Sequence, residues 1–570
     1  MKNTLGLNVK QKQFVFSKSK KILLIACAGS GKTLVITRKV GQLIDERVSP
    51  ESIYCISFTR AAAMELKTRL IKLNKLGKDI NATTFHSFII CFMKKYCNSN
   101  FSMITDSEKD IVLNNICQRF KIKSIKKFKE AYKTSLINDD KSIQYAINEY
   151  IFRLNYLNLM DIDILLPLFL KKIKEDSILL DNIRQDIEYL FYDEAQDMNN
   201  LQYQILTTII PPESDKGFAL IGDDDQNLYQ WNNTDVKYIL DFPEKYGAEV
   251  FILDENYRCS NQIIKASNAI ISKNTKRFDK SVSGFFDKDL LNLCSFETEQ
   301  EEIIRLVGLA FSYKHNKEKT LAILCRTNKE IERINKVFKS MNIDSNTSIK
   351  EILNSSNIEF LKLVVNPAND LLVEKVIGIS KENKIKALEE EKSFFEILLE
   401  EKNGLALKVS MFNCMARTQK AMQIYNTISS NLNIEDIQLE NAIKCWTSKL
   451  KSSKANSLND FLNYIETKDA QENLKDGTSN INITTIHGAK GLEFDEVVLF
   501  NFDNFNFSSQ GDVEETRRLL YVAFTRAKEK LNLYFSKKNF YKQKECSCTV
   551  SPFLKELPGN DVWFEDYFKE

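Results

Sequence analysis

The chain has 570 residues, so at roughly 150 residues per domain it is too long to fold around a single core. Hydrophobic residues make up 43% and charged residues 28%, with only 8 prolines, which excludes collagenous, low-complexity and largely disordered classes. The formal net charge is only +3, so any surface for nucleic acid has to be local.

Membrane and secretory signals are not recognisable in the sequence. No apolar stretch approaches the ~18 residues of a membrane span, and the polar segment 1–12 lacks the apolar centre of a secretory signal, so a cytoplasmic location is expected. The 12 cysteines are scattered and form no CxxC pair. We therefore expect reduced, mostly buried thiols and no disulfide framework or zinc ribbon.

Short apolar runs, each followed by glycines or acidic residues and then by a helical pattern, predict buried parallel strands of an α/β sheet. Two groups of such runs predict two sheets. The first group lies at 22–26, 53–57, 187–192, 218–221 and 250–253, and the second at 321–325, 483–486, 497–500 and 531–535. Helical periodicity without strand signals at 89–160 and 368–470 predicts two helical insertions, and the charged run 387–403 predicts a solvated helix face.

A phosphate-binding loop is predicted directly after the first strand. Residues 26–33 are Ala-Cys-Ala-Gly-Ser-Gly-Lys-Thr, and an apolar helical pattern follows. Small residues let backbone N–H groups approach phosphate oxygens, Lys32 neutralises the β and γ phosphates, and Thr33 is a ligand for Mg²⁺. Ala26 stands where this pattern usually has glycine, and a plain glycine-rich turn is the alternative interpretation.

A pair of carboxylates, Asp193 and Glu194, ends the predicted strand 187–192. At a strand end Asp193 can hold Mg²⁺, while Glu194 can be aimed at the water that attacks the γ phosphate. The alternative is an acidic helix cap, but the phosphate-binding loop upstream favours ATP hydrolysis.

Further segments follow one another in a recognisable order: 7–11 (LNVKQ), 57–66 (SFTRAAAMEL), 83–88 (TTFHSF), 193–197 (DEAQD), 222–226 (GDDDQ), 256–258 (NYR), 485–494 (TIHGAKGLEF) and 518–527. Together with the phosphate-binding loop, these segments resemble the motifs of the UvrD/Rep-like superfamily 1 helicases. The resemblance covers most of 7–260 and 483–558.

The resemblance implies a P-loop NTPase of the α/β class, with two RecA-like parallel-sheet domains that each carry a helical insertion. The first motor domain is expected at 1–88 and 161–249, with its insertion at 89–160. The second is expected at 250–367 and 471–570, with a shortened insertion at 368–470.

The resemblance also assigns a nucleotide site, with ATP and Mg²⁺ as cofactors. The expected catalytic residues are Lys32, Glu194, Gln226 as sensor of the γ phosphate, and Arg258 and Arg526 as cations facing the phosphates across a cleft. The expected nucleotide-binding residues are Gln11, Ala28, Gly29, Ser30, Gly31, Lys32, Thr33, Tyr257 and Glu493, and the expected metal ligands are Thr33 and Asp193.

Contacts with the DNA strand are expected from motif residues that offer aromatic faces and polar groups. These residues are Phe58, Thr59, Arg60, Thr84, His86, Tyr229, Trp231 and His487. After Trp231 the family usually has Arg-Gly-Ala, whereas this chain has Asn232-Asn233-Thr234. The missing cation leaves open how ATP state and strand contact are coupled.

The sequence is thus expected to encode an ATP-dependent DNA helicase or translocase that moves 3′ to 5′ on single-stranded DNA and separates strands. The alternative is an ATP-gated DNA-end sensor subunit of a repair or phage-defence complex, which does not unwind processively. Expected partners are single-stranded DNA and junctions of single and double strands. The chain ends about a dozen residues after Pro558, so any nuclease is expected to be a separate protein.

Overall fold

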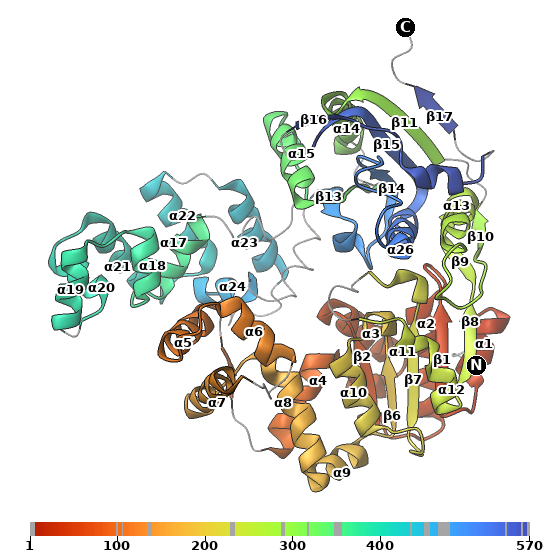
Figure 1. Ribbon diagram of the computed structural model, residues 1–570, viewed down its shortest axis with the longest axis horizontal. Coiled ribbons are helices and arrows are strands. Elements are labelled where there is room, and N and C mark those ends of the chain that lie inside the picture. The colour runs from red at the N-terminus through yellow and green to blue at the C-terminus, as the bar shows by residue number, and fades with distance from the viewer. Residues whose placement is uncertain are drawn as a thin grey trace. The chain divides into compact units, whose positions relative to one another are not determined.

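The computed structural model divides the chain into two compact units, both visible in Figure 1. One unit comprises Met1–Leu291, Phe507–Glu529 and Pro552–Val562, and the other comprises Asn292–Asn506, Lys530–Ser551 and Trp563–Glu570. The structure describes residues 6–97, 101–104, 106–134, 140–228, 234–286, 291–315, 318–346, 356–390, 392–433, 436–449, 456–465, 479–541, 544–559 and 563–566.

The first unit is built on a six-stranded sheet with the order β3-β2-β6-β7-β1-β8. Every neighbouring pair in this sheet is parallel. The strands are β1 (Lys21–Ala26), β2 (Ile53–Ser57), β3 (Asn81–Thr84), β6 (Tyr189–Tyr192), β7 (Gly217–Gly222) and β8 (Glu249–Leu253).

Helices cover both faces of this sheet because successive strand residues point to opposite sides. On β1, Leu23 and Ile25 join the core under α4 (Phe85–Tyr96), α8 (Ile162–Glu175) and α10 (Asn200–Ile209). Ile22 and Leu24 join the opposite core, under α1 (Val9–Phe16), α2 (Lys32–Asp45) and α3 (Arg60–Leu73). The edge strand β8 is the exception to the predicted burial, since Val250 is 38% exposed.

A helical segment connects α4 to α8 in the first unit. It contains α5 (Asp106–Arg119), α6 (Ile125–Thr134) and α7 (Lys141–Tyr156). The stretch predicted to be helical also holds two short strands, β4 (Ser102–Met103) and β5 (Leu159–Met160), which pair in parallel. A buried ion pair joins α5 to the start of α8, because Lys109 Nζ lies 2.9 Å from Asp161 Oδ2.

The first unit is completed by segments from later in the sequence. The short strands β9 (Glu255–Ser260) and β10 (Ser283–Phe286) pair with each other, and α13 (Asn261–Ile271) packs on α26 (Val513–Phe524). The other helices are α9 (Ser177–Asp186), α11 (Lys237–Leu240), α12 (Phe242–Tyr246) and the 3₁₀ turns η2 (Pro50–Ser52), η3 (Lys75–Asp79), η4 (Ala195–Asp197), η5 (Asp224–Gln226) and η8 (Pro552–Glu556).

The second unit contains a seven-stranded sheet, in which six strands have the order β13-β12-β14-β15-β11-β17 and the seventh, β16, pairs antiparallel with β15. The buried strand β12 pairs in parallel with both of its neighbours. The strands are β11 (Leu291–Thr298), β12 (Leu321–Cys325), β13 (Ile481–Thr485), β14 (Phe494–Leu499), β15 (Ala527–Tyr541), β16 (Lys544–Ser547) and β17 (Trp563–Asp566). Helices α14 (Glu299–His315) and α15 (Asn328–Ser340) and the turn η7 (His487–Ala489) accompany them.

A separate helical core lies within the second unit. It is formed by α17 (Ser356–Val365), α18 (Asp370–Val376), α20 (Phe394–Glu400), α21 (Gly404–Ala416), α22 (Ala421–Leu432), α23 (Ile437–Lys449) and α24 (Leu458–Ile465). Helix α19 (Lys381–Glu389) packs on α20. The run 387–403 is only partly the solvated face that was predicted. Phe395 and Leu398 are buried in this core, while Lys392 pairs with Glu390 and Glu400 on the outside.

The α/β class and the two sheets agree with the prediction. Within the described residues, no helix is both long and apolar enough to cross a lipid bilayer. The cysteine side chains that the structure describes are all unbridged, and most of them are buried.

Candidate functional site

The phosphate-binding loop connects β1 to α2 and is shaped by two glycines. Gly29 and Gly31 have φ angles of 69° and 82°, in the left-handed region that favours glycine. The loop closes on itself because Ser30 N–H donates to Cys27 O at 3.1 Å. Among the described residues, the buried Ser30 hydroxyl has no hydrogen-bond partner, and a buried polar group of this kind suits a loop that binds phosphate oxygens.

Gln11 lies directly beside this loop. Its side-chain Nε2 donates to Ser30 O at 3.0 Å, and a Cβ on Gly31 would lie only 3.1 Å from the same nitrogen. A reciprocal cap with Asn8 at the start of α1 fixes the Gln11 side chain, and Gln11 is 2% exposed. The contact therefore joins the N-terminal helix to the phosphate-binding loop.

The two predicted carboxylates, Asp193 for Mg²⁺ and Glu194 for catalysis, follow β6 and face the loop lysine. Lys32 Nζ lies 3.2 Å from Asp193 Oδ1 and also contacts Glu194. Glu194 has a φ of 56°, which is uncommon for a residue with a side chain and often marks a functional site. The sheet therefore brings Lys32, Asp193 and Glu194 together, although 160 residues of sequence separate the loop from the acids.

Electrostatics at this cluster follow from burial and charge. Burial raises the pKa of Asp193, even though Lys32 opposes the shift. Burial would lower the pKa of Lys32, but the charges of Asp193 and Glu194 raise it above its ordinary value. Lys32 is thus a fixed cation between the loop and the acids.

Gln226 ends η5, after β7, and contacts Arg526, which follows the end of α26. Its Nε2 donates to Asp223 Oδ2 at 2.7 Å, and its Oε1 accepts from Arg526 Nη2 at 3.3 Å. Arg526 is 2% exposed, and burial together with the charge of Arg258 lowers its pKa to about 10. The structure therefore places Gln226, Arg526 and Arg258 in one neighbourhood.

The turn that carries Arg258 sits on the phosphate-binding loop. Asn256 Nδ2 donates to Ala28 O at 2.7 Å, and Tyr257 N–H donates to Gly29 O at 3.0 Å. The approach is so close that a Cβ on Gly29 would lie 2.8 Å from Arg258 Cβ. Arg258 is thereby held at the loop. The Tyr257 ring is 41% exposed, and its hydroxyl accepts from Asn8 Nδ2.

The segments predicted to contact DNA leave the ends of two paired strands. Ser57 and Thr84 are register partners on β2 and β3, so Phe58–Arg60 and Thr84–His86 emerge side by side. Phe58 is 49% exposed, while Thr59 caps α3 by accepting from Ala62 N–H. Tyr229, Trp231, Asn232 and Asn233 lie outside the described residues, and Thr234 is buried.

His487 and Glu493 belong to the second unit. His487 begins the turn η7 after β13, and the exposed Glu493 precedes β14. These two predicted residues therefore lie on a different unit from the phosphate-binding loop.

Two domains of one known protein family match most of this chain. Residues 7–247 match the UvrD/REP helicase N-terminal domain, and residues 251–412 and 381–538 match the UvrD-like helicase C-terminal domain. The chain belongs to the UvrD/REP helicase family. The resemblance inferred from the motifs is confirmed, and with it the fold class of two RecA-like domains.

Relatives of this UvrD/REP family protein cover nearly its whole length. The ATP-dependent DNA helicase Rep of Buchnera aphidicola subsp. Schizaphis graminum is 28% identical over 660 residues, covering 98% of each chain. The Rep of Buchnera aphidicola subsp. Acyrthosiphon pisum is 27% identical, covering 98% of this chain and 99% of the relative. The ATP-dependent DNA helicase PcrA of Staphylococcus aureus (strain MRSA252) is 25% identical, covering 97% of this chain and 86% of the relative.

Three groups at the site of this UvrD/REP helicase were not predicted as site residues. Gln196 contacts Glu194 through Nε2 and accepts from Asp223 N–H through Oε1 at 3.0 Å, so it joins the acidic pair to the segment after β7. Asn256 holds the loop carbonyl described above. Gln196 and Asn256 stand inside the motifs 193–197 and 256–258, so the sequence could have predicted them as site residues. Lys280 contacts Asp223–Asp225 and lies in no motif.

Proposed function

We propose that this chain is an ATP-driven motor that moves 3′ to 5′ along single-stranded DNA and separates strands. The observation that most supports the hydrolytic half is the meeting of Lys32, Asp193 and Glu194 at the phosphate-binding loop. The relatives named above are ATP-dependent DNA helicases, so the comparisons do not favour the end-sensor alternative.

Each residue at the loop has a distinct task in phosphoryl transfer. Lys32 neutralises the β and γ phosphates as they enter the loop, where it now pairs with the acids. Glu194 orients the attacking water and accepts its proton. Arg258 and Arg526 supply positive charge, which stabilises the equatorial oxygens of the transferred group. The polar side chain of Gln226, held between Asp223 and Arg526, senses whether the γ phosphate is present.

The donor set fits Mg²⁺. Thr33 offers a hydroxyl and Asp193 a carboxylate, and both are hard oxygen ligands. The contact of Lys32 Nζ with Asp193 Oδ1 places this carboxylate next to the phosphate-binding loop. Mg²⁺ bound by these residues would neutralise charge on the phosphate oxygens. Glu194 is left for the water.

Phe58 offers a face for a DNA base. Its ring is half exposed, on the residue that follows the pairing of Ser57 with Thr84, and aromatic faces of this kind stack bases without regard to sequence. We infer that the strand crosses the first unit over the carboxyl ends of β2 and β3.

Phe58→Ala is expected to weaken binding of a single-stranded oligonucleotide by ~1–3 kcal/mol, because one stacked base loses its partner. Fluorescence anisotropy with a labelled oligonucleotide measures the affinity, and ATP turnover with and without DNA measures the stimulation. Phe311→Ala is a matched control, since Phe311 is 39% exposed on α14 and stands in no motif. Equal affinities for the Phe58 variant and the unaltered protein would remove Phe58 from the strand path.

A further inference from the structure

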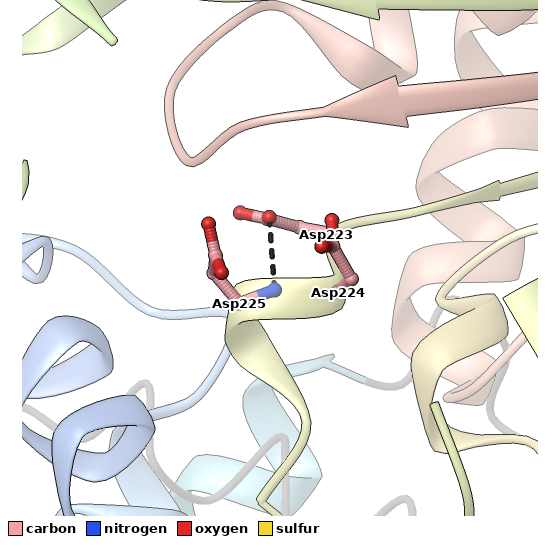
Figure 2. A group of neighbouring side chains, drawn as sticks. All are labelled: Asp223, Asp224 and Asp225. Carbon is pink, nitrogen blue, oxygen red and sulfur yellow. Dashed lines mark hydrogen bonds between the residues drawn. The ribbon is translucent and has the colours of Figure 1, made fainter. Parts of the chain in front are cut away.

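Three consecutive aspartates are buried together after β7. Asp223 and Asp224 are 0% exposed and Asp225 is 1% exposed, and their oxygens lie within 4.8 Å of one another. Figure 2 shows the three side chains gathered around η5, with Asp225 N–H directed at Asp223. Buried carboxylates this close repel one another strongly, so they need positive charge nearby.

Lys280 supplies that charge. Its side chain is fully buried, and Nζ lies 3.3 Å from Asp223 Oδ1, 2.5 Å from Asp224 Oδ1 and 2.8 Å from Asp225 Oδ2. Although the spacing of the three acids is that of a metal site, the ammonium group occupies the place of a cation. Burial raises the pKa of Asp224 to about 6, and Lys280 opposes this shift.

Arg277 completes the set from the same segment. Its Nε and Nη2 both donate to Asp225 at 2.9 Å, and Phe278 N–H donates to Asp224 Oδ2 at 2.7 Å. Arg277 donates to Asp225 and not to Asp223. Among the described contacts of this segment, Lys280 is therefore the cation that pairs with Asp223.

Asp223 connects Lys280 to Gln226, the predicted sensor of the γ phosphate. Its Oδ1 faces Lys280, while its Oδ2 accepts from Gln226 Nε2 at 2.7 Å and from the Tyr521 hydroxyl at 3.4 Å. A carboxylate only accepts, so the Gln226 amide must turn its NH₂ group to Asp223. The Gln226 oxygen then faces Arg526, which only donates.

We propose that Lys280 is a positioning residue for ATP hydrolysis, which acts through Asp223 to fix the amide of Gln226 and thereby the guanidinium of Arg526. This inference rests on the proposed ATPase function and adds a residue outside the motifs. Lys280 itself touches neither ATP nor DNA in this account. Its loss leaves three crowded acids without their central charge and releases the amide to turn.

The test compares steady-state ATP turnover with single-stranded DNA for the unaltered protein, Lys280→Met and Lys280→Arg. Lys280→Met is expected to lower kcat by about 10- to 100-fold, with the KM for ATP changed by less than about threefold, since misorientation affects the transition state. Lys280→Arg is expected to recover part of the rate because it retains the charge. In a Gln226→Ala background, Lys280→Met should cost little further rate, because the amide on which it acts is already gone.

A matched control separates positioning from stability. Lys109→Met removes a 5% exposed lysine from Asp161 and Asp163 at the start of α8, and is expected to lower the melting temperature with little change in kcat. A folded Lys280→Met protein with near-normal kcat, or a loss of rate fully additive with Gln226→Ala, would overturn the proposal. An unaltered protein without ATPase activity would instead overturn the proposed function.

If Lys280→Met does not fold, Asp223→Asn tests the same chain of contacts. Because Lys280 only donates, the new amide oxygen must face it, which leaves the new NH₂ group opposite the NH₂ of Gln226. The Gln226 amide then turns away from its present orientation, and kcat should fall. Near-normal kcat in this folded variant would contradict the proposal.

Discussion

Glu194→Gln will abolish ATP turnover but retain ATP binding, whereas Lys32→Ala will lose both. Glu194 aligns the attacking water, so its amide variant keeps the loop, Lys32 and Asp193 in place and traps the nucleotide. Lys32→Ala removes the counter-charge for the phosphates and leaves Asp193 and Glu194 without the cation that they now contact. We expect the rate to fall below detection in both variants.

Equilibrium binding of a fluorescent ATP analogue separates the two variants. Glu46→Gln is the control, since Glu46 also pairs with a lysine, Lys18, but does so at the end of α2. This control should leave turnover and binding unchanged. Equal loss of nucleotide affinity in Glu194→Gln and Lys32→Ala would contradict the roles assigned to them.

Arg526→Ala and Arg258→Ala are each expected to lower kcat by about 10³-fold, with a much smaller effect on ATP affinity. The reason is that each arginine is proposed to stabilise the transition state as an arginine finger. Arg526 is buried against Gln226, and Arg258 is fixed by the turn on the phosphate-binding loop. Arg526 thus lies beside the predicted sensor of the γ phosphate, and the backbone at Arg258 lies at the phosphate-binding loop.

Rapid-quench measurement of a single turnover isolates the chemical step from product release. Arg184→Ala is the matched control, because Arg184 donates to the backbone oxygens of Ile209 and Thr208 and lies in no motif. Its expected rate is that of the unaltered protein. Retention of the normal rate by an Arg526 or Arg258 variant would remove that arginine from the site.

The sequence predicted the parts of the fold that are local and strongly patterned. The run 53–57 is β2 and the run 321–325 is β12, because each is a continuous apolar stretch buried on both faces. Strand β3 was missed because Asn81–Thr84 is short and polar, and its place is decided by pairing with β2. The run 187–192 forms a strand only from Tyr189, since Ile187 is the residue that caps the end of α9.

The same distinction holds at the site. Lys32, Asp193 and Glu194 could be predicted because loop, strand end and acid pair each have a local pattern. The partnership of Lys280 with Asp223–Asp225 could not, since more than fifty residues, including the strands β8 and β9, lie between them and a lone lysine is usually solvated. Which charges neutralise one another in a core depends on tertiary packing, which the local pattern does not encode.

Displacement of streptavidin from biotinylated single strands tests the central claim most directly. A motor that moves 3′ to 5′ runs toward the 5′ end, so ATP should speed the release of streptavidin from a 5′-biotinylated oligonucleotide and not from a 3′-biotinylated one. Lys32→Ala should show no ATP-dependent release from either end. DNA-stimulated ATP hydrolysis without release from either end, or release from the 3′ end alone, would contradict the account.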